Sequence, residues 1–216
     1  MPQTSFIPAN ESWFHIRFFG WFTKWLCRYR FRRVWIRQET YPEPGDRTIW
    51  YLNHTSWWDG LIPLLLNNYR FRQEARALME DKQMMEHKFF SRIGAFSVNL
   101  DDPRSSVVSL RYAVDSMKRE NASLFIYPEG KIVPWSTDKP EFRAGLPWLC
   151  KQLPKVDVVP VAITIHTMKS SKPDLHICIG KPCTDKDQHD LEIALQAELI
   201  RSAENLQNRD FWERLV

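Results

Sequence analysis

Short apolar runs that end in polar loops, each followed by a helix-like segment, constrain the fold of this chain more than any other feature. The run Thr48–Leu52 stops at Asn53 and His54, and a second apolar run begins at Leu61, directly after Asp59-Gly60. This pattern is typical of a buried strand, a short polar loop and then a helix. In α/β sheets, loops at the carboxyl ends of strands commonly hold functional sites.

The same alternation continues along the chain. Further strands are expected over residues 75–79, 94–100, 123–127, 157–165 and 175–179. Helices are expected over residues 61–69, 82–93, 103–119, 142–152 and 187–208. Pro160 predicts that its strand lies at a sheet edge or carries a bulge, because proline has no N–H for the ladder. Strands that alternate with helices predict an α/β layered fold.

Length and cysteine usage narrow the class of protein. A chain of 216 residues is long enough for one domain with a substantial core. Its four cysteines show no metal-binding spacing, and we expect them to be reduced thiols in a cytosolic compartment. The N-terminus shows no secretory signal pattern, and no apolar run approaches the roughly 20 residues of a membrane-spanning helix.

Residues 13–37, which follow a loose arm over residues 1–12, combine many aromatic and basic side chains. On a helix, one face would carry Phe14, Phe18, Trp21, Phe22, Trp25, Leu26 and Tyr29. The opposite flank would carry Arg17, Lys24 and Arg28, and further arginines follow at 30, 32, 33 and 37. A bulky aromatic face with basic residues is typical of a helix that lies in a membrane interface without spanning it.

Two alternatives exist for this segment. The aromatic face can pack on the protein's own core, with the basic residues as a solvated edge. The basic and aromatic side chains can also bind nucleic acid by charge and stacking. The basic stripe does not continue into a recognisable reader module, so no nucleic-acid partner is expected.

The loop after the first strand holds a base and a carboxylate in a useful spacing. Asp59 follows His54 by five residues, so a turn between them can fold the carboxylate back onto the imidazole. A carboxylate on one ring nitrogen fixes the tautomer and makes the other nitrogen the better base. The alternative is a structural histidine beside an aspartate that caps the next helix.

A second strand-end loop carries Glu129 between Pro128 and Gly130, followed by Lys131. Taken alone, it could be an ordinary turn. Taken with the other loops, it completes an ordered set of four blocks: Asn53-His54-x4-Asp59, Gly94-x-Phe96 with Val98, Tyr127-Pro128-Glu129-Gly130 and Val158-Val159-Pro160-Val161. This set resembles the four blocks of the glycerolipid acyltransferase family that includes 1-acylglycerol-3-phosphate acyltransferase, over residues 34–182.

The resemblance implies a fold and a domain layout. It implies a mixed, largely parallel sheet flanked by helices, preceded by an N-terminal amphipathic helical segment on the membrane surface. Residues 1–33 would form the arm and membrane-associating segment, and residues 34–216 the acyltransferase domain. The protein would then be peripheral, on the cytoplasmic face of a membrane.

The resemblance also implies roles for the blocks. His54 would act as general base on the hydroxyl of a lipid acceptor, which attacks the thioester of acyl-CoA or acyl-carrier protein. Asp59 would orient His54, and Glu129 with Gly130 would help to hold the acceptor. No metal and no cofactor are implied, since the acyl donor is a co-substrate.

The chain departs from the family pattern at two positions associated with the acceptor's phosphate. Leu100 and Ile132 stand where the family usually has arginines. A planar guanidinium suits a phosphate, and neither aliphatic side chain can replace it. We therefore expect lysophosphatidic acid to be a poor acceptor relative to a lipid without a terminal phosphate, unless Arg104 and Lys131 fill the vacancy.

Two alternatives to acyl transfer are a hydrolase and a non-catalytic protein. A hydrolase would use Ser56 as nucleophile and His54 as base, but the chain has no Gly-x-Ser-x-Gly elbow. A non-catalytic membrane-binding protein could retain the fold without turnover. Intact His54, Asp59 and Glu129 favour the enzyme.

Overall fold

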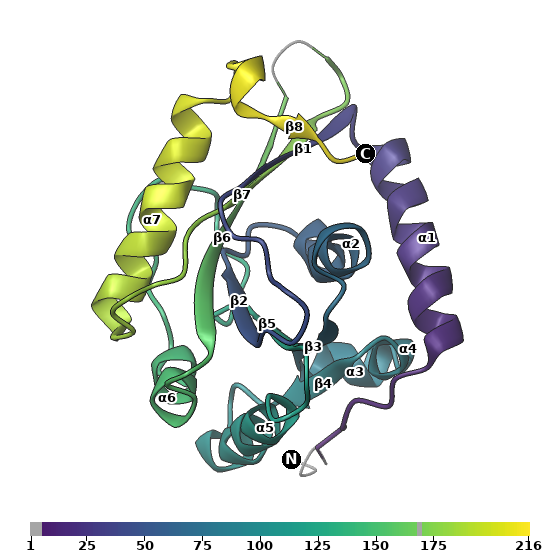
Figure 1. Ribbon diagram of the computed structural model, residues 1–216. Coiled ribbons are helices and arrows are strands. Elements are labelled where there is room, and N and C mark those ends of the chain that lie inside the picture. The colour runs from purple at the N-terminus through teal and green to yellow at the C-terminus, as the bar shows by residue number, and fades with distance from the viewer. Residues whose placement is uncertain (1–5, 168–169) are drawn as a thin grey trace.

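The structure is a computed structural model that describes residues 6–167 and 170–216. In that part of the chain, eight strands form one sheet in the order β4-β3-β5-β2-β6-β7-β1-β8 (Figure 1). The strands are β1 (Arg33–Gln38), β2 (Thr48–Leu52), β3 (Glu74–Glu80), β4 (Ala95–Val98), β5 (Ala122–Ile126), β6 (Asp157–His166), β7 (Asp174–Ile179) and β8 (Glu213–Arg214). Only the β6–β7 and β1–β8 pairs are antiparallel among these described strands. The predicted mixed, largely parallel sheet is confirmed.

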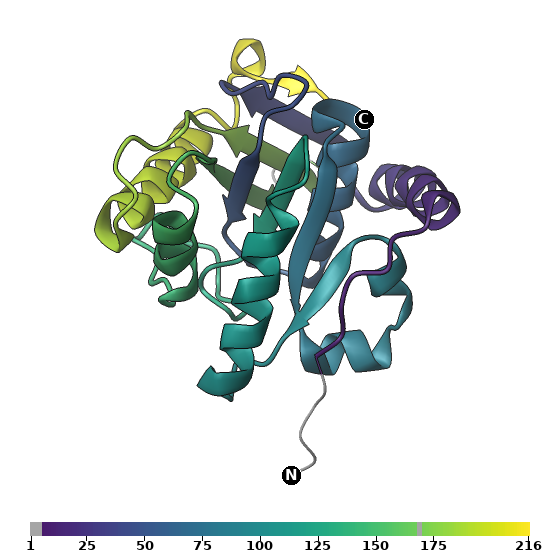
Figure 2. The same cartoon turned by 60° about the horizontal axis from the view of Figure 1, so that its bottom comes forward.

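Helices cover both faces of the sheet. They are α1 (Trp13–Arg30), α2 (Ile62–Leu66), α3 (Asp81–Glu86), α4 (Phe89–Arg92), α5 (Pro103–Ser116), α6 (Gly145–Gln152) and α7 (Gln188–Glu204). Side chains of α5, α6 and α7 belong to one core cluster, and side chains of α1 and α2 belong to another. Figures 1 and 2 show these two sets of helices on opposite sides of the sheet.

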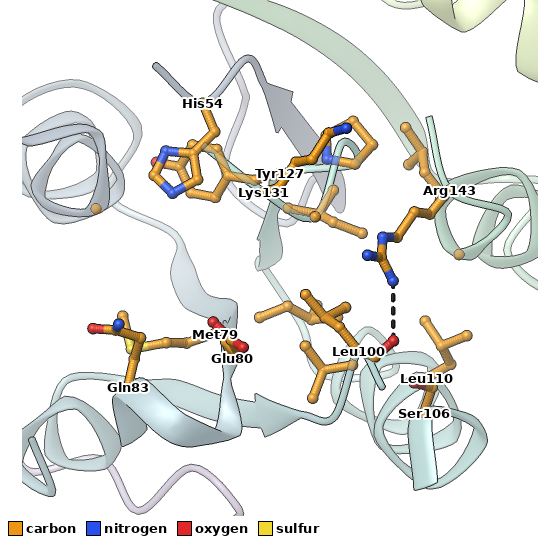
Figure 3. A pocket seen from close by; sticks show the side chains of 18 of the residues that line it. His54, Met79, Glu80, Gln83, Leu100, Ser106, Leu110, Tyr127, Lys131 and Arg143 are labelled. Atoms are coloured by element: carbon orange, nitrogen blue, oxygen red, sulfur yellow. Dashed lines mark hydrogen bonds between the residues drawn. The ribbon is translucent and has the colours of Figure 1, made fainter. Parts of the chain in front are cut away.

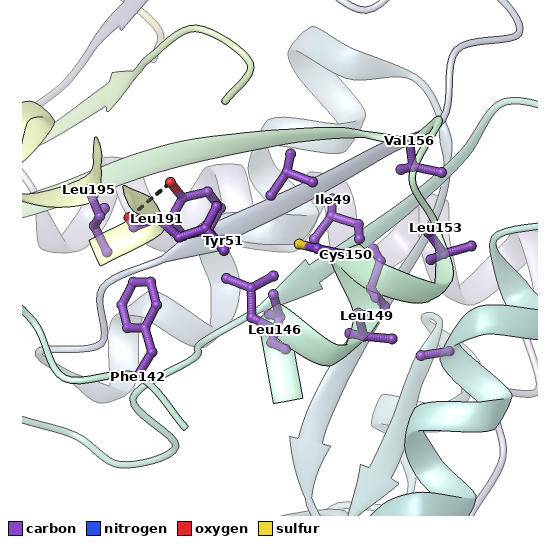
Figure 4. Packing of buried hydrophobic residues seen from close by; sticks show 14 of the residues in the cluster. Ile49, Tyr51, Phe142, Leu146, Leu149, Cys150, Leu153, Val156, Leu191 and Leu195 are labelled. Atoms are coloured by element: carbon purple, nitrogen blue, oxygen red, sulfur yellow. Dashed lines mark hydrogen bonds between the residues drawn. The ribbon is translucent and has the colours of Figure 1, made fainter. Parts of the chain in front are cut away.

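Strand β2 shows why these runs are continuously apolar. Ile49 and Tyr51 point into the cluster beneath α5–α7, whereas Trp50 and Leu52 point into the cluster beneath α1 and α2. Successive side chains of a strand point to opposite faces, so a strand covered on both sides needs apolar residues throughout. The phenol of Tyr51 is satisfied by donating to the carbonyl of Leu191 over 3.1 Å (Figure 4).

The basic segment after α1 contains a strand that the sequence analysis missed. The helix ends at Arg30, and β1 follows within three residues. β1 pairs in parallel with β7, from Arg33 opposite Asp174 to Gln38 opposite Ile179. Its partner lies about 140 positions further along the chain, so local sequence alone did not indicate the pairing.

Two predicted helices are broken in the structure. The segment expected over residues 61–69 is a 3₁₀ turn (Trp57–Leu61), then α2, then a π turn (Asn67–Phe71). Pro63 lies in the first turn of α2, where a missing N–H is tolerated. The helix expected over residues 82–93 divides into α3 and α4, because His87 leaves the helical conformation at φ −129° and ψ 70°.

The edge or bulge predicted from Pro160 is wrong for the strand as a whole. β6 is an interior strand between β2 and β7. Pro160 pairs with Tyr51 on the β2 side, while the ladder with β7 begins only at Val161. The missing N–H therefore falls just before that second ladder starts, which is why an interior strand accommodates the proline.

All four cysteines are free thiols. Within the described residues, no helix has the length and apolar composition needed to cross a bilayer.

Candidate functional site

Two loops meet at the carboxyl ends of the neighbouring parallel strands β2 and β5. Thr48 to Tyr51 of β2 pair with Ser123 to Ile126 of β5, so the segments that follow the two strands emerge side by side. The first segment carries His54, and the second carries Tyr127 to Lys131. This sheet edge is the usual position for a site in an α/β fold.

His54 and Asp59 form a close pair. The Nδ1 atom of His54 lies 3.3 Å from Oδ2 of Asp59. Asp59 is fully buried, and its carboxylate accepts hydrogen bonds from the backbone N–H groups of Thr55 and Ser56 at 2.6 and 2.8 Å. The Ser56 hydroxyl donates to the other carboxylate oxygen at 2.9 Å. These hydrogen bonds satisfy the buried carboxylate of Asp59 and hold it on the Nδ1 side of the imidazole.

The loop after β5 also holds His54 in place. The backbone N–H of His54 donates to Oε2 of Glu129 at 3.1 Å, and the carbonyl of His54 accepts from the N–H of Val133 at 2.8 Å. The Tyr127 ring centre lies 4.5 Å from the imidazole centre. Its hydroxyl donates to the backbone carbonyl of Asp59 at 2.5 Å. The two loops are therefore one hydrogen-bonded unit.

Burial changes the acidity of two groups in this unit. It raises the pKa of Tyr127, and the nearby Asp59 charge acts in the same direction, so the phenol stays protonated and remains a donor. Burial also raises the pKa of the Glu129 carboxyl, although the His54 N–H and the Lys131 charge oppose the rise.

Asn53 anchors the start of the loop that carries His54. Its side-chain amide donates to the carbonyl of Ile163 at 2.9 Å, and its oxygen accepts from the N–H of Ile163 at 2.6 Å. The amide thus continues the contact between β2 and β6 one residue after β2 ends. This contact explains why a polar residue is buried directly before His54.

A cavity of about 690 Å³ opens beside His54 (Figure 3). Its apolar lining includes Leu61, Leu78, Met79, Phe90, Val98, Leu100, Val107, Leu110, Ile126, Ile132, Leu146 and Trp148. Its polar lining includes His54, Glu80, Gln83, Ser106, Arg111, Lys131 and Arg143. A mostly apolar cavity with a base on its wall suits a ligand that has a hydrocarbon chain and a reactive polar end.

The residues singled out from the sequence take different places. His54, Gly130 and Lys131 line the cavity. Glu129 is buried beneath the His54 loop and is not among the described residues that line the cavity. Arg104 is exposed in the first turn of α5 and is likewise not part of the described lining. Leu100 and Ile132 both line the cavity.

Arg143 is a cavity residue that the sequence analysis missed. Its guanidinium donates from Nη1 to the carbonyl of Leu100 at 3.0 Å, and Figure 3 shows it projecting into the cavity region that also holds Lys131. The only local signal is its place two residues before α6. That position alone does not distinguish it from any other arginine near a helix start.

Helix α1 presents its aromatic face outward. Small or short side chains, Gly20, Thr23 and Cys27, form its buried side. The exposed large side chains are Trp13, Phe14, Phe18, Trp21, Trp25 and Tyr29, with exposed fractions from 47% to 73%. The alternative in which this aromatic face packs on the protein's own core does not fit these exposures.

Comparison with known proteins identifies relatives of this fold. The family profile described as Acyltransferase matches residues 33–164, more than half of the chain. The crystal structure of PlsC, the 1-acyl-sn-glycerophosphate (LPA) acyltransferase from Thermotoga maritima, superposes with a TM-score of 0.60 at 17% sequence identity. The superposition covers 90% of this chain and 81% of that one. A comparison with curated protein sequences gives no match.

Proposed function

Because the chain belongs to the glycerolipid acyltransferase family, we propose that it transfers a fatty acyl group from a thioester to the hydroxyl of a lipid acceptor at a membrane surface, with His54 as general base. The observation that carries this proposal is the His54–Asp59 pair on the wall of an apolar cavity. Asp59 occupies the Nδ1 side of the imidazole, which leaves Nε2 for the substrate.

The chemistry follows from this geometry. Nε2 of His54 removes the proton of the acceptor hydroxyl as the oxygen attacks the thioester carbonyl, because a neutral hydroxyl is a poor nucleophile. The tetrahedral intermediate then collapses and the C–S bond breaks. The imidazolium returns its proton to the leaving thiolate, so the products are an ester and a free thiol. The buried Asp59 carboxylate stabilises the transient imidazolium.

Glu129 acts in this proposal as a positioning residue. The family resemblance assigned it to the acceptor, yet its carboxyl oxygen bonds to the backbone N–H of His54 and lies outside the described cavity lining. Gly130 and Lys131, which follow it, are in place to contact the acceptor. The donor is a long-chain thioester of CoA or of acyl-carrier protein.

Helix α1 supports action at a membrane surface. Its outward aromatic face and the basic side chains of Arg17 and Arg28 suit an anionic bilayer interface. In this proposal residues 1–33 associate with the cytoplasmic face of a membrane and residues 34–216 carry the chemistry.

The hydrolase alternative has less support. Ser56 would have to donate its hydroxyl proton to His54, but that hydroxyl donates to Oδ1 of Asp59. The non-catalytic alternative keeps the fold without turnover, and a turnover assay separates it from the enzyme.

The test is release of free CoA from long-chain acyl-CoA in the presence of a lysolipid panel. His54→Ala should lower kcat by about 10²–10⁴-fold with an unchanged melting temperature. Ser56→Ala is the matched control and should keep most of the transfer activity, since it removes only one of the bonds to Asp59. Near-normal turnover in a pure, folded His54→Ala protein would refute the mechanism. Loss of turnover in Ser56→Ala together with esterase activity in the wild type would favour the hydrolase.

A further inference from the structure

We propose that the mouth of the His54 cavity is a second membrane contact, at which Trp57, Val107 and Ile132 insert into an anionic bilayer beside α1. The three side chains are called the mouth residues below. The inference rests on the proposed function in one respect, which is the placement of α1 on a membrane. It goes beyond that function because the new contact lies within residues 34–216.

The mouth residues are large apolar side chains that remain exposed. Trp57, Val107 and Ile132 have exposed fractions of 56%, 41% and 55%. Each of them also lines the cavity. A side chain that both lines a cavity and reaches solvent lies at its opening, so these residues give the cavity an apolar mouth. Exposed apolar surface that gathers at one place marks an interaction site.

The mouth is assembled from three segments of the chain. Trp57 begins the 3₁₀ turn after β2, Val107 lies on α5, and Ile132 lies in the loop after β5. The N–H of Val133 donates to the carbonyl of His54 at 2.8 Å. This bond holds Ile132 close to the loop that leads from His54 into Trp57. The apolar mouth is therefore fixed to the part of the structure that holds the base.

Trp57 and its neighbour Trp58 have opposite environments. Trp58 is partly buried and packs against the core cluster beneath α1 and α2, with its ring edge-on to Phe31 at a centroid distance of 5.6 Å. Trp57 contacts Trp58 edge-on, also at 5.6 Å, and is mostly exposed. The core position is thus already filled by Trp58. An exposed indole suits a membrane interface, because its ring is apolar and its N–H is polar.

The mouth is joined to the C-terminal end of α1. The guanidinium of Arg30, the last residue of α1, lies 5.7 Å from the centre of the Trp58 ring. Trp58 in turn contacts Trp57. Only one side chain therefore separates the end of α1 from the mouth.

The N-terminal half of α1 is joined to the cavity wall in the same way. Phe19 of α1 stacks on Phe89 of α4, with ring centres 4.6 Å apart. Phe89 contacts Phe90 at 4.3 Å, and Phe90 lines the cavity. Figure 1 shows α1 running along the outside of α2 from α4 to β1. A membrane that receives the aromatic face of α1 consequently lies close to the cavity as well.

Charge around the mouth favours an anionic lipid surface as the partner. Exposed Lys131 precedes Ile132, and exposed Arg111 lies one helical turn after Val107. Basic side chains beside exposed apolar ones suit anionic head groups above hydrocarbon. The cavity behind the mouth is lined mostly by apolar side chains. A hydrocarbon chain can therefore pass from the bilayer into the cavity without crossing water.

Insertion of Trp57 is tested by fluorescence quenching without any acyl donor. The vesicles contain phosphatidylcholine with a minority of phosphatidylglycerol, and their acyl chains are either brominated or plain. Trp13, Trp21 and Trp25 of α1 are first replaced by Phe, which keeps their apolar character and removes their signal. In that background we expect bromine to quench a component of the emission that Trp57→Phe removes.

Trp135→Phe is the matched control for the quenching experiment. Trp135 is 39% exposed and is not among the described residues that line the cavity. Its indole donates to the Thr164 hydroxyl at 3.2 Å, and Thr164 contacts Ser202 of α7. Trp135 is therefore held on the α7 side of the sheet, and its replacement should leave the bromine-dependent quenching unchanged.

The contribution of the mouth to affinity is tested by vesicle co-sedimentation. Trp57→Ser combined with Ile132→Ser should weaken binding to plain vesicles of the same composition by about 10-fold, with the melting temperature unchanged. The matched control is Tyr41→Ser combined with Ile193→Ser, which removes two exposed apolar side chains outside the described lining. This control should bind like the wild type. Helix α1 is intact in both variants.

The proposal is overturned if bromine quenches no component that depends on Trp57, or if the mouth variant and its control bind vesicles equally. A lipid-free dimer that Trp57→Ser dissociates, with vesicle binding unchanged, would assign the mouth to a second copy of the chain and would also overturn it. Quenching of Trp57 in a protein whose His54→Ala variant keeps normal turnover would refute the catalytic mechanism and leave this contact standing.

Discussion

Glu129 accepts a hydrogen bond from the backbone N–H of His54 at 3.1 Å, although the two residues are 75 positions apart. The bond joins the loop after β5 to the loop after β2. Glu129 is only 7% exposed, so its carboxyl supports His54 from beneath. The position of His54 in the cavity therefore depends on a residue that is not in the described lining of that cavity.

Substitutions at Glu129 test this supporting role. Glu129→Gln keeps an oxygen for the His54 N–H and should retain most activity. Glu129→Ala leaves that N–H without its partner in a buried place, which typically costs about 1–3 kcal/mol. We expect it to lower kcat by about 10-fold or more with little change in KM, measured by CoA release. Exposed Glu141→Ala is the control. A large rise in KM with unchanged kcat would instead show that Glu129 contacts the acceptor.

The stability of the wild type and of Glu129→Gln should differ in their dependence on pH. Burial raises the pKa of Glu129, so the folded state binds this proton more tightly than the unfolded state does. Stability from this group is then present at low pH and is lost as pH rises through the raised pKa. Glutamine cannot ionise, so the Glu129→Gln variant does not lose this stability. Its melting temperature should therefore rise relative to that of the wild type as the pH is raised from 4 to 7. Melting temperatures that stay parallel across this range would contradict the prediction.

Asp59→Asn should damage catalysis severely while the fold survives. Oδ2 of Asp59 faces Nδ1 of His54 and also accepts from the N–H groups of Thr55 and Ser56. An amide oxygen in that place lacks the negative charge, and an NH₂ group there opposes the two N–H donors and favours the wrong His54 tautomer. In hydrolytic triads the same change costs about 10⁴ in rate. We expect a loss of about 10²–10⁴ in kcat, measured beside the melting temperature. Activity within a few-fold of wild type would show that the carboxylate does not orient the base.

Replacing the exposed aromatic face of α1 should release the protein from anionic membranes. The variant changes Phe18, Trp21 and Trp25 to serine, which removes apolar area that the protein's own core does not cover. Co-sedimentation with vesicles containing anionic lipid should fall strongly, with the melting temperature unchanged.

The matched control for α1 changes two other exposed apolar residues, Ile193 and Ile200 of α7, to serine. This control should bind vesicles like the wild type. If the α1 variant still sediments with the vesicles, or if both variants lose binding equally, α1 is not the membrane contact.

The burial of His176 predicts that folding stability falls at low pH. It is 1% exposed on β7 and stacks on His166 of β6, with ring centres 4.8 Å apart. Burial lowers the pKa of His176 to about 3, and the neighbouring His166 adds to this effect, whereas Asp174 opposes it. The unfolded chain binds the proton near pH 6.5, so stability is lost as pH falls below that value.

His176→Phe keeps a ring in this position but cannot be protonated. Between pH 6.5 and pH 4 we expect the slope of unfolding free energy against pH to fall by up to about 1.4 kcal/mol per pH unit. Exposed His87→Gln is the control. Denaturant titrations at each pH measure the slope, and an unchanged slope would mean that His176 is not the acid-sensitive group.

The sequence alone determined the features that depend on near neighbours. The pairing of His54 with Asp59 follows from five residues of loop, and the buried strands follow from continuous apolar runs such as Thr48–Leu52. Order along the chain indicated the family and the mixed, largely parallel sheet, because parallel strands need the helical crossovers that the alternating pattern predicts.

Only the tertiary structure decided the features that depend on distant partners. Residues 33–38 form strand β1 because they pair with β7, about 140 positions further along the chain. Glu129 reaches the backbone N–H of His54 because β2 and β5 are neighbours in the sheet. Arg143 enters the cavity because Gly130 leaves space for it and Leu100 supplies a carbonyl. None of these contacts has a local sequence signal, since each requires two segments that come together only when the sheet forms.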